Sequence, residues 1–433
     1  MKIYLDSVGC RLNQAEIERY AWEFRAAGHT LVASPQEADL AVVNTCTVTS
    51  AAASDSRQRV RQIARAGVEK IIATGCWTTI QPERAAALDG VTGIVPNLHK
   101  DHLVSTVLGL PQEDFELEPV EREPIPGSRQ KTRAFIKVQD GCDNHCTFCI
   151  TRIARGPARS RLVSQVLADI RAALNGRHAG GGEKGAREVV LTGVHLGSWG
   201  QDLSPPKRLK DLIQVVLKET DAPRLRLSSL EPWDLDEDFF GLWQNPRLCR
   251  HLHLPLQSGS HFILRRMARN TSPEDFAHIV ESARRAIPGL AITTDVIVGF
   301  PGETEAHFEE SMSFIRQMQF AGGHVFTFSE RPGTPASRLP DSVPYPIRKR
   351  RNARMQDLFA AVSRAYQQKF IGKTLEALWE SVTAVPGGWD MVGWTDNYLR
   401  VTVRSPRDLW NQITPAHLKG LQDGVFQAEL LSS

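Results

Sequence analysis

The stretch AFIKVQDGCDNHCTFC, residues 134–149, decides the fold of the central part of the chain. It opens with a largely apolar strand candidate, residues 134–138, and three clustered cysteines follow shortly after. Five further strand candidates alternate with helical patterns downstream, at residues 188–194, 225–230, 251–256, 292–298 and 324–328. Six βα units fall short of the eight strands of a closed TIM barrel, so we expect a partial, splayed (β/α)6 barrel with ligands at the carboxyl ends of its strands.

Upstream of this region, three short apolar runs alternate with helical patterns, at residues 3–8, 40–43 and 71–73. This alternation predicts a parallel sheet with helices on its faces, a Rossmann-like α/β domain. A cysteine stands just beyond each run: Cys10, Cys46 and Cys76. Parallel strands collect ligands at their carboxyl ends, so three thiols should meet at one place. We interpret these three cysteines as ligands of a metal cluster with an open iron rather than as buried structural cysteines. This cluster would be separate from any group held by the cysteines of residues 142–149, and Gly9 and Gly75 would let the backbone approach it.

The chain divides further by composition. Residues 111–127 hold four prolines and six acidic residues, which indicates a linker. The expected domains are 1–110, then the linker at 111–130, a barrel domain at 131–368 and a C-terminal domain at 369–433. Alternating runs at 375–379, 398–403 and 426–430 predict that the last domain is a small all-β barrel. Residues 338–369 carry eight Lys or Arg against two Asp, a basic helical arm, and a Gly-rich insertion at 178–185 should carry no chemistry.

The overall composition is that of a globular protein. The 433 residues include 52 Lys plus Arg against 49 Asp plus Glu, a net charge of +3, and 41% are hydrophobic. No run approaches the roughly 18 to 20 apolar residues of a membrane span, and the first residues have no apolar signal core, so we expect a cytoplasmic protein without membrane contact. Seven cysteines without an export signal favour metal or redox chemistry over disulfides. The seventh, Cys249, belongs to no cysteine motif and is expected to be structural.

The C-x3-C-x2-C spacing of Cys142, Cys146 and Cys149 is the sharpest signal in the chain. Zinc sites prefer paired C-x2-C units and four closed ligands, whereas three clustered thiolates suit three irons of a cubane cluster and leave its fourth iron open. The alternative is zinc held by these cysteines plus His145. It is the weaker interpretation, because His145 abuts Cys146 and would turn inward only with difficulty.

This spacing, with an aromatic residue just before the third cysteine, resembles the radical S-adenosylmethionine (AdoMet) superfamily. The resemblance implies that Cys142, Cys146 and Cys149 hold a 4Fe-4S cluster whose open iron chelates AdoMet. One electron can then break the C–S bond of AdoMet and give a 5′-deoxyadenosyl radical. Phe148 would lie against the adenine of AdoMet, or be an ordinary core aromatic. We name no catalytic residue beyond the cluster ligands.

With both triplets in place, the chain resembles the methylthiotransferases of that superfamily over essentially its whole length. The matching segments are GCRLNQ (9–14), NTCTVT (44–49), ATGC (73–76), ARGP (154–157), LPLQSGS (254–260), DVIVGFPGET (295–304) and PGTPA (332–336). The resemblance implies that Cys10, Cys46 and Cys76 hold an auxiliary 4Fe-4S cluster and that the C-terminal barrel is an RNA-binding TRAM domain. One AdoMet would be the methyl donor to a sulfur at the auxiliary cluster, and a second the radical source.

Residues 44–49, 191–197 and 324–326 look most like the branch that acts on N6-threonylcarbamoyladenosine (t6A) at tRNA position 37 and makes its 2-methylthio derivative. The implied partners are the tRNA anticodon stem-loop and an electron donor such as flavodoxin or ferredoxin. Gln139, Asp140 and His145 depart from the residues expected around the cluster loop. The alternatives are the same chemistry on isopentenyladenosine in tRNA or on an aspartate of a ribosomal protein, and, more distantly, a noncatalytic RNA-binding protein with structural metal.

Other residues are candidates for ligand contacts. Thr192, Ser229, Gln257 and Glu303 stand at or just past barrel strand ends and could hold AdoMet, although polar residues are common there. Four arginines, at 152, 155, 159 and 161, could pair with phosphate or with the carboxylate of AdoMet, or be solvated. Arg155, or another of these four, is the candidate for the anionic threonylcarbamoyl group.

The net charge of the C-terminal barrel does not indicate RNA binding, but a short pattern on one expected strand does. Residues 369–433 hold six Lys or Arg and seven Asp or Glu, so their net charge is −1. Tyr398, Arg400 and Arg404 place an aromatic and two cations on one expected strand, an arrangement that stacks unpaired bases and holds phosphates. With the basic arm, this favours RNA as the partner.

Overall fold

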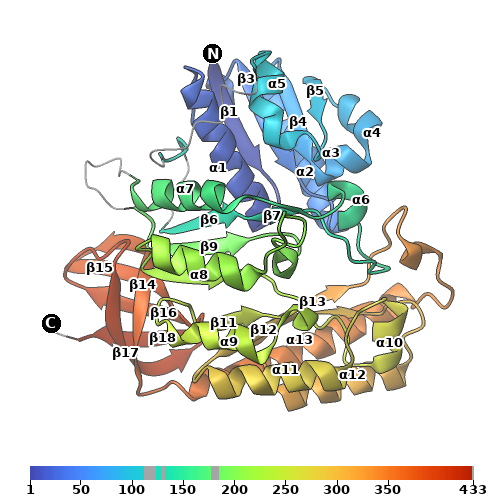
Figure 1. The fold of residues 1–433 in the computed structure, drawn as a ribbon, viewed down its shortest axis with the longest axis vertical. Helices are drawn as coiled ribbons and strands as arrows, with labels where there is room; N and C mark the ends of the chain where they lie inside the picture. The colour runs from blue at the N-terminus through green and yellow to red at the C-terminus, as the bar shows by residue number, and fades with distance from the viewer. Residues whose placement is uncertain (112–122, 128–131, 177–184, 432–433) are drawn as a thin grey trace.

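The structure is a computed structural model, and it describes residues 1–111, 123–127, 132–176 and 185–431. Most of the expected linker and of the Gly-rich insertion lies outside these residues. Figure 1 shows a blue N-terminal α/β unit above a green-to-orange central barrel, with a red β-barrel at its lower left. The expected domain boundaries stay a prediction, and the helices and strands of each unit fall within them.

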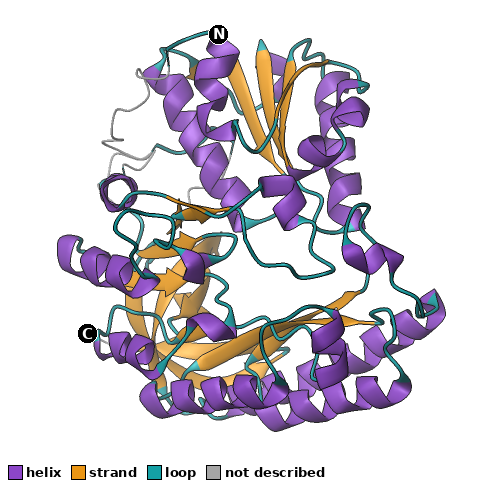
Figure 2. Cartoon of the chain, turned by 45° about the vertical axis from the view of Figure 1, so that its right-hand side comes forward, coloured by secondary structure: helices purple, strands orange, loops and turns teal. Residues whose placement is uncertain are grey.

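The N-terminal unit is a five-stranded parallel sheet in the order β2-β1-β3-β4-β5. Its strands are β1 (Lys2–Ser7), β2 (Thr30–Leu31), β3 (Leu40–Thr45), β4 (Ile71–Gly75) and β5 (Val91–Val95). Helices α1 (Arg11–Ala26), α2 (Ser50–Arg65), α3 (Cys76–Ile80), α4 (Pro82–Ala86) and α5 (Leu103–Leu108) connect and cover the strands. Helices lie on both faces of this sheet (Figure 2). The order is that of a flavodoxin-like sheet, whose ligands sit where neighbouring connections diverge, beside β1 and β3.

The central unit confirms the partial barrel. Two three-stranded parallel sheets, β10-β9-β6 and β11-β12-β13, are joined by isolated bridges between the β10 and β11 segments. The strands are β6 (Arg133–Lys137), β9 (Glu188–Thr192), β10 (Arg224–Leu227), β11 (His251–His253), β12 (Ala291–Val298) and β13 (Gly322–Thr327). All five residues of β9 are buried, as expected of a parallel strand covered on both faces. The sheets bring all six carboxyl ends to one mouth.

Helices cover the outside of this barrel (Figure 2). They are α7 (Val163–Leu174), α8 (Leu209–Glu219), α9 (Glu237–Phe240), α10 (His261–Arg266), α11 (Pro273–Ala286), α12 (Glu305–Met318) and α13 (Tyr345–Gln368). The sequence starts two of them with side-chain caps: Ser272 accepts from the amide of Asp275, and Thr304 from that of His307. Between β6 and α7, the cysteine loop is framed by a short pair, β7 (Gln139–Asp140) and β8 (Arg159–Ser160), and by α6 (Thr151–Arg155).

The C-terminal unit is a closed barrel in the order β14-β15-β16-β18-β17. Its strands are β14 (Thr374–Val385), β15 (Gly388–Thr395), β16 (Arg400–Ser405), β17 (Ile413–Gln422) and β18 (Val425–Leu430). Its core includes the fully buried Trp379, Val401 and Phe426. Within the described residues, no helix combines the length and the apolar character needed to cross a membrane.

The basic arm is the helix α13, but part of its charge is neutralised. Arg351 pairs with Glu303 and Glu305, and Arg354 pairs with Glu305 and with Glu309 of α12. Lys349 and Arg350 remain exposed. The arm is therefore a weaker cationic surface than its residue count predicts.

Candidate cluster and substrate sites

Three cysteines meet at the carboxyl edge of the N-terminal sheet. Cys10 caps the start of α1, Cys46 follows β3, and Cys76 is the first residue of α3, directly after β4. Burial, with the neighbouring Cys10 and Cys76 thiols, raises the pKa of the Cys46 thiol to about 11. A Cβ on Gly9, the residue before Cys10, would lie 2.7 Å from the Cys46 sulfur, so these two strand ends are close together, and a shared cluster of all three cysteines stays a prediction. Cys10 is exposed, so the site is open to the outside of the sheet.

The two glycines in this site serve the protein's own packing. Gly9 has a φ of +106°, and a Cβ on it would lie 2.7 Å from the sulfur of Cys46. Gly75 has a φ of +99°, and its Cβ would lie 2.3 Å from the carbonyl oxygen of Thr45. Both glycines make room for the neighbouring strand and its cysteine, and the expected approach of the backbone to a cluster stays a prediction.

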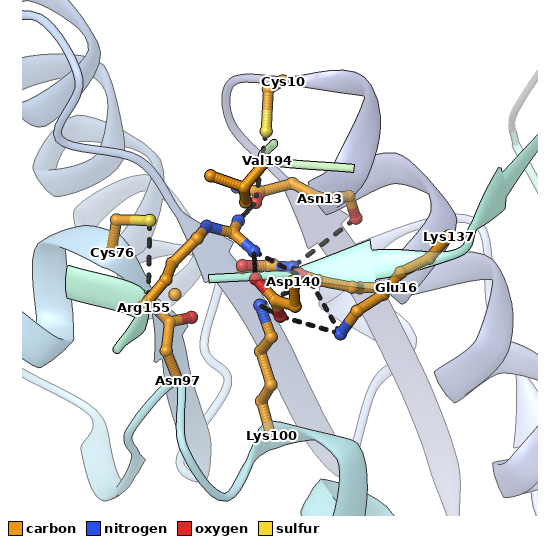
Figure 3. Close-up of polar contacts among 12 residues, drawn as sticks. Cys10, Asn13, Glu16, Cys76, Asn97, Lys100, Lys137, Asp140, Arg155 and Val194 are labelled. Atoms are coloured by element: carbon orange, nitrogen blue, oxygen red, sulfur yellow. Dashed lines mark hydrogen bonds and ion pairs between the residues drawn. The ribbon is translucent and has the colours of Figure 1, made fainter. Parts of the chain in front are cut away.

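Two buried asparagines accompany these thiols. Asn13 offers its Oδ1 to the Cys10 thiol at 3.6 Å, and Asn97 donates from Nδ2 to the Cys76 sulfur at 3.5 Å and to the Ala154 carbonyl at 2.7 Å. Asn97 follows β5, a strand that the sequence did not predict, so it was missed. Its contact with Ala154 ties the N-terminal site to α6 of the barrel unit. Figure 3 shows Asn97 beside Cys76.

The second triplet lies on the loop between β7 and α6. Cys149 accepts a hydrogen bond from the amide of Thr151 at 3.4 Å, and Cys146 accepts one from Arg269 at 3.7 Å. Burial raises the pKa of both thiols, while these donors oppose the rise. Donors aimed at sulfur stabilise thiolates and the charge of a cluster bound through them. No sequence pattern pointed to Arg269.

His195 completes this second site. Its Nε2 lies 2.7 Å from a carboxylate oxygen of Asp234. Although burial lowers it, hydrogen bonding to Asp234 and to Cys142 raises the pKa of His195 to about 10. A protonated His195 places a cation beside Cys142. The residue lies in segment 191–197, which carried the family resemblance, but no role for it was predicted.

The geometry separates the cluster and zinc interpretations. Over the residues that the structure describes, no three His, Cys, Asp or Glu are placed to hold a single metal ion. The side chain of His145 instead lies 2.6 Å from Arg152. A cubane cluster spreads its three thiolate ligands farther apart than one ion does, and each triplet carries polar groups directed at sulfur. His145 is therefore not placed as a fourth zinc ligand, and three thiolates with polar groups beside them suit a cluster with an open iron.

A buried ionic network lies beside the N-terminal cysteines (Figure 3), and its member Asp140 stands two residues before Cys142 of the second triplet. Lys100 lies 2.5 Å from Glu16 and 2.9 Å from Asp140, and Asp140 also lies 2.9 Å from both Lys137 and Arg155. None of these five side chains is more than 8% exposed. Burial raises the pKa of Glu16 and Asp140, but the facing cations outweigh it and hold both below their ordinary values. The network ties α1 of the N-terminal unit to β6 and the cysteine loop.

Arg155 is not a surface arginine. It is 3% exposed, and its guanidinium donates to Asp140 at 2.9 Å, to Glu16 at 3.2 Å and to Asn13 at 2.8 Å. The prediction that it pairs with phosphate or with the threonylcarbamoyl carboxylate is therefore wrong, because three acceptors of the protein already occupy its donors. Its charge instead lies near Cys10 and Cys76.

The AdoMet candidates lie at the barrel mouth, with mixed outcomes. Thr192 ends β9, and Ser229 follows β10. Gln257 has a φ of +71°, a conformation that non-glycine residues rarely adopt and that marks a constrained loop. Their contacts with AdoMet stay a prediction.

Phe148 and Glu303 have other contacts. Phe148 is partly buried against the cluster of Ile263, Met267 and Phe300, which favours the core alternative. Glu303 accepts from the Gly299 amide and from Arg351, both at 2.8 Å, so its carboxylate shapes the loop after β12 rather than facing a ligand.

Tyr398 lies outside the strand on which it was expected. It stands in the turn before β16, with a φ of +63°, and its ring stacks on His251 and Trp394. Its hydroxyl accepts from Arg11 at 2.9 Å. The prediction that it stacks an RNA base is wrong, because the ring is packed at the junction of the three units. Arg400 and Arg404 are on β16 and exposed, as expected of phosphate contacts.

Two family models match the chain: the description "Uncharacterized protein family UPF0004" over residues 2–95, and "Radical SAM superfamily" over residues 136–315. The first covers the N-terminal sheet with Cys10, Cys46 and Cys76. The second covers the cysteine loop and most of the partial barrel.

Curated relatives match nearly the whole chain. The Threonylcarbamoyladenosine tRNA methylthiotransferase MtaB of Bacillus subtilis is 34% identical over 419 residues, 94% of this chain and 91% of that protein. The protein of the same name from Thermotoga maritima is 36% identical over 398 residues, 90% of this chain and 89% of that protein. The tRNA-2-methylthio-N(6)-dimethylallyladenosine synthase of Cereibacter sphaeroides is 35% identical over 425 residues, 94% of this chain and 93% of that protein.

Among solved structures, the radical S-adenosylmethionine methyltransferase TsrM from Kitasatospora setae superposes with a TM-score of 0.58 at 13% identity, covering 78% of this chain and 77% of that one. At this identity the likeness shows a shared fold.

Proposed function

The chain belongs to the methylthiotransferase family of radical AdoMet enzymes, and on that premise we propose that it converts t6A at position 37 of tRNA to 2-methylthio-N6-threonylcarbamoyladenosine. The observation that carries the proposal is the similarity to a threonylcarbamoyladenosine tRNA methylthiotransferase over 94% of the chain, in a sequence that keeps both cysteine triplets. A tRNA substrate implies that the protein acts in the cytoplasm.

Each triplet fits a 4Fe-4S cluster, with Cys142, Cys146 and Cys149 at the barrel mouth and Cys10, Cys46 and Cys76 at the edge of the N-terminal sheet. When bound, the clusters and AdoMet supply the electron, the radical, the methyl group and the sulfur that the reaction needs. The described side chains supply the surroundings. Arg269 and the Thr151 amide donate to cysteine sulfurs, His195 lies beside Cys142, and the buried network fixes the two cysteine sites relative to one another.

The RNA must present adenine outside its stack, because C2 is inaccessible within stacked bases. An anticodon loop provides such a base at low cost. We assign binding of the anticodon-stem phosphates to the exposed Arg400 and Arg404 of the C-terminal barrel, and to Lys349 and Arg350 of α13. The electron comes from a small redox protein such as flavodoxin or ferredoxin.

The second candidate is methylthiolation of dimethylallyladenosine (isopentenyladenosine) in tRNA. It is favoured by the 35% identity to a synthase of that product over 94% of the chain. The two candidates share every chemical step and differ in the N6 substituent, which is anionic in t6A and apolar in dimethylallyladenosine.

Mass spectrometry of tRNA nucleosides tests the substrate. We expect the reconstituted protein to convert t6A-bearing tRNA and to convert tRNA without the threonylcarbamoyl group poorly. Equal turnover of dimethylallyladenosine tRNA, or modification of a ribosomal protein aspartate with no activity on tRNA, would overturn the assignment but not the radical chemistry.

Variants of the two triplets test the cofactors. After anaerobic reconstitution we expect about eight irons per chain, and about half of that when Cys142, Cys146 and Cys149 are replaced together by Ala. Replacing Cys10, Cys46 and Cys76 should leave reductive cleavage of AdoMet intact and stop methylthiolation. Stoichiometric zinc in the isolated protein, or AdoMet cleavage that survives loss of the loop triplet, would contradict the assignment.

A further inference from the structure

Arg331 lies on a loop that touches both cysteine sites. This loop follows β13. At one end, the hydroxyls of Ser329 and Ser50 lie 2.9 Å apart, and Ser50 begins α2 shortly after Cys46. At the other end, the amide of Ala336 donates to the carbonyl of Thr147 on the loop of the second triplet, at 2.9 Å. Arg331 stands between these two attachments.

The guanidinium of Arg331 is buried without an acceptor. The residue is 8% exposed, and within the described ranges its Nε and Nη2 have no hydrogen-bond partner. The other buried arginines of the described chain donate to carboxylates or carbonyls of the protein: Arg155, Arg224, Arg226, Arg269 and Arg351. An unpaired buried cation is costly, so Arg331 calls for an anionic partner that the described side chains do not supply.

The surroundings define the partner's chemistry and place. Arg331 stands two residues after Ser329, whose hydroxyl lies 2.9 Å from that of Ser50, four residues after Cys46, so the loop holds Arg331 near the auxiliary triplet. Burial lowers the pKa of Arg331, and Cys46 opposes the shift. A planar guanidinium fork matches the two oxygens of a carboxylate or phosphate. In t6A, the N6 substituent that ends in a carboxylate is attached to C6, which only N1 separates from the reacting C2. An adenine whose C2 reaches the space between the triplets therefore brings an oxyanion close to this loop.

We propose that Arg331 binds an oxyanion of the target nucleotide between the two cysteine sites, with the threonylcarbamoyl carboxylate as the first source and a flanking phosphate as the second. The proposal rests on the proposed function and names the residue that reads the substituent. The carboxylate of AdoMet is a poorer match, since AdoMet is assigned to the other triplet and the loop of Arg331 contacts α2 at Ser50, shortly after Cys46. Arg331 thus takes the part that the sequence suggested for Arg155.

Binding of labelled anticodon stem-loops to the full-length reconstituted protein tests this. One stem-loop carries t6A at position 37 and the other unmodified adenosine, and fluorescence anisotropy gives each Kd. We expect Arg331→Gln to weaken binding of the t6A stem-loop by roughly ten- to a hundredfold, the range for hydrogen bonds to a charged group. Arg331→Lys keeps the positive charge but loses the two-pronged guanidinium, so it should weaken binding of the t6A stem-loop less. This variant also provides the test if Arg331→Gln does not fold. The matched control is Arg316→Gln, on the exposed face of α12, with no expected change.

The two stem-loops distinguish the threonylcarbamoyl carboxylate from a flanking phosphate as the oxyanion that Arg331 binds. A loss confined to the t6A stem-loop identifies the carboxylate, and an equal loss with both stem-loops identifies a phosphate. Unchanged affinity for both, or a loss of AdoMet affinity in place of RNA affinity, would overturn the proposal. Since the readout is binding, failure of the proposed function, seen as wild-type turnover of dimethylallyladenosine tRNA alone, is distinguishable from failure of Arg331 to bind an oxyanion.

Discussion

Replacing Asp140 by Asn should loosen the junction between the N-terminal sheet and the barrel. Asp140 faces Lys100, Lys137 and Arg155, each at 2.9 Å. When the Asp140 carboxylate is removed, Glu16 is the one fully buried carboxylate of the network that still faces these three cations. Removing one partner of a buried ion pair costs about 3 to 5 kcal/mol, because the uncompensated charge cannot be hydrated. An exposed pair costs about 0 to 1 kcal/mol.

Native-state hydrogen exchange measures the free energy of local opening at this junction. It suits a chain of several units, because these units need not unfold together. Amides of α1 and β6 should exchange roughly a hundred- to several thousandfold faster in Asp140→Asn than in the wild type, the factor that corresponds to the expected free energy. The matched control is Asp390→Asn. The Asp390 side chain is 56% exposed and lies 3.9 Å from Arg404. Equal effects of the two variants on these amides would refute the reasoning that the buried network fixes the junction.

Three further outcomes follow from the same contacts. Burial raises the pKa of Asp140 but Lys137 and Arg155 hold it well below its usual value, so its stabilising contribution is full above the ordinary aspartate pKa of about 4 and is lost as the pH falls toward the lowered pKa of the folded state. The exchange difference between wild type and Asp140→Asn should therefore shrink below about pH 4. Gly9→Ala places a Cβ 2.7 Å from the Cys46 sulfur at a φ of +106° and should abolish loading of the auxiliary cluster, with iron assays falling by about half; full iron content would contradict this. Arg400→Gln with Arg404→Gln should reduce the slope of log Kd for tRNA against log salt by roughly 1.5 to 2, and an unchanged slope would exclude phosphate contacts by β16.

The sequence by itself determined the architecture and the positions of both cysteine triplets. Strand periodicity predicted the six barrel strands, since a buried parallel strand is a local apolar run whatever it packs against. The C-x3-C-x2-C spacing and the strand-end cysteines are also local features, which is why the chemistry could be predicted with them. The short edge strand β2 and the half-exposed β5 were missed because their patterns are too short and too polar to stand out.

Only the tertiary structure decided which charged and aromatic side chains serve the site. In the sequence, Arg155 and Tyr398 are a cation and an aromatic near a motif, and Arg331, which directly precedes the PGTPA segment, carried no prediction. In the fold, Arg155 is neutralised by Glu16, which is 139 residues away along the chain, Tyr398 is packed against His251, and Arg331 alone is left without an acceptor among the buried arginines described. The physical reason is that a charge in a protein interior takes its role from whichever opposite charge the packing of two separate units brings within about 3 Å, and sequence spacing carries no information on that distance.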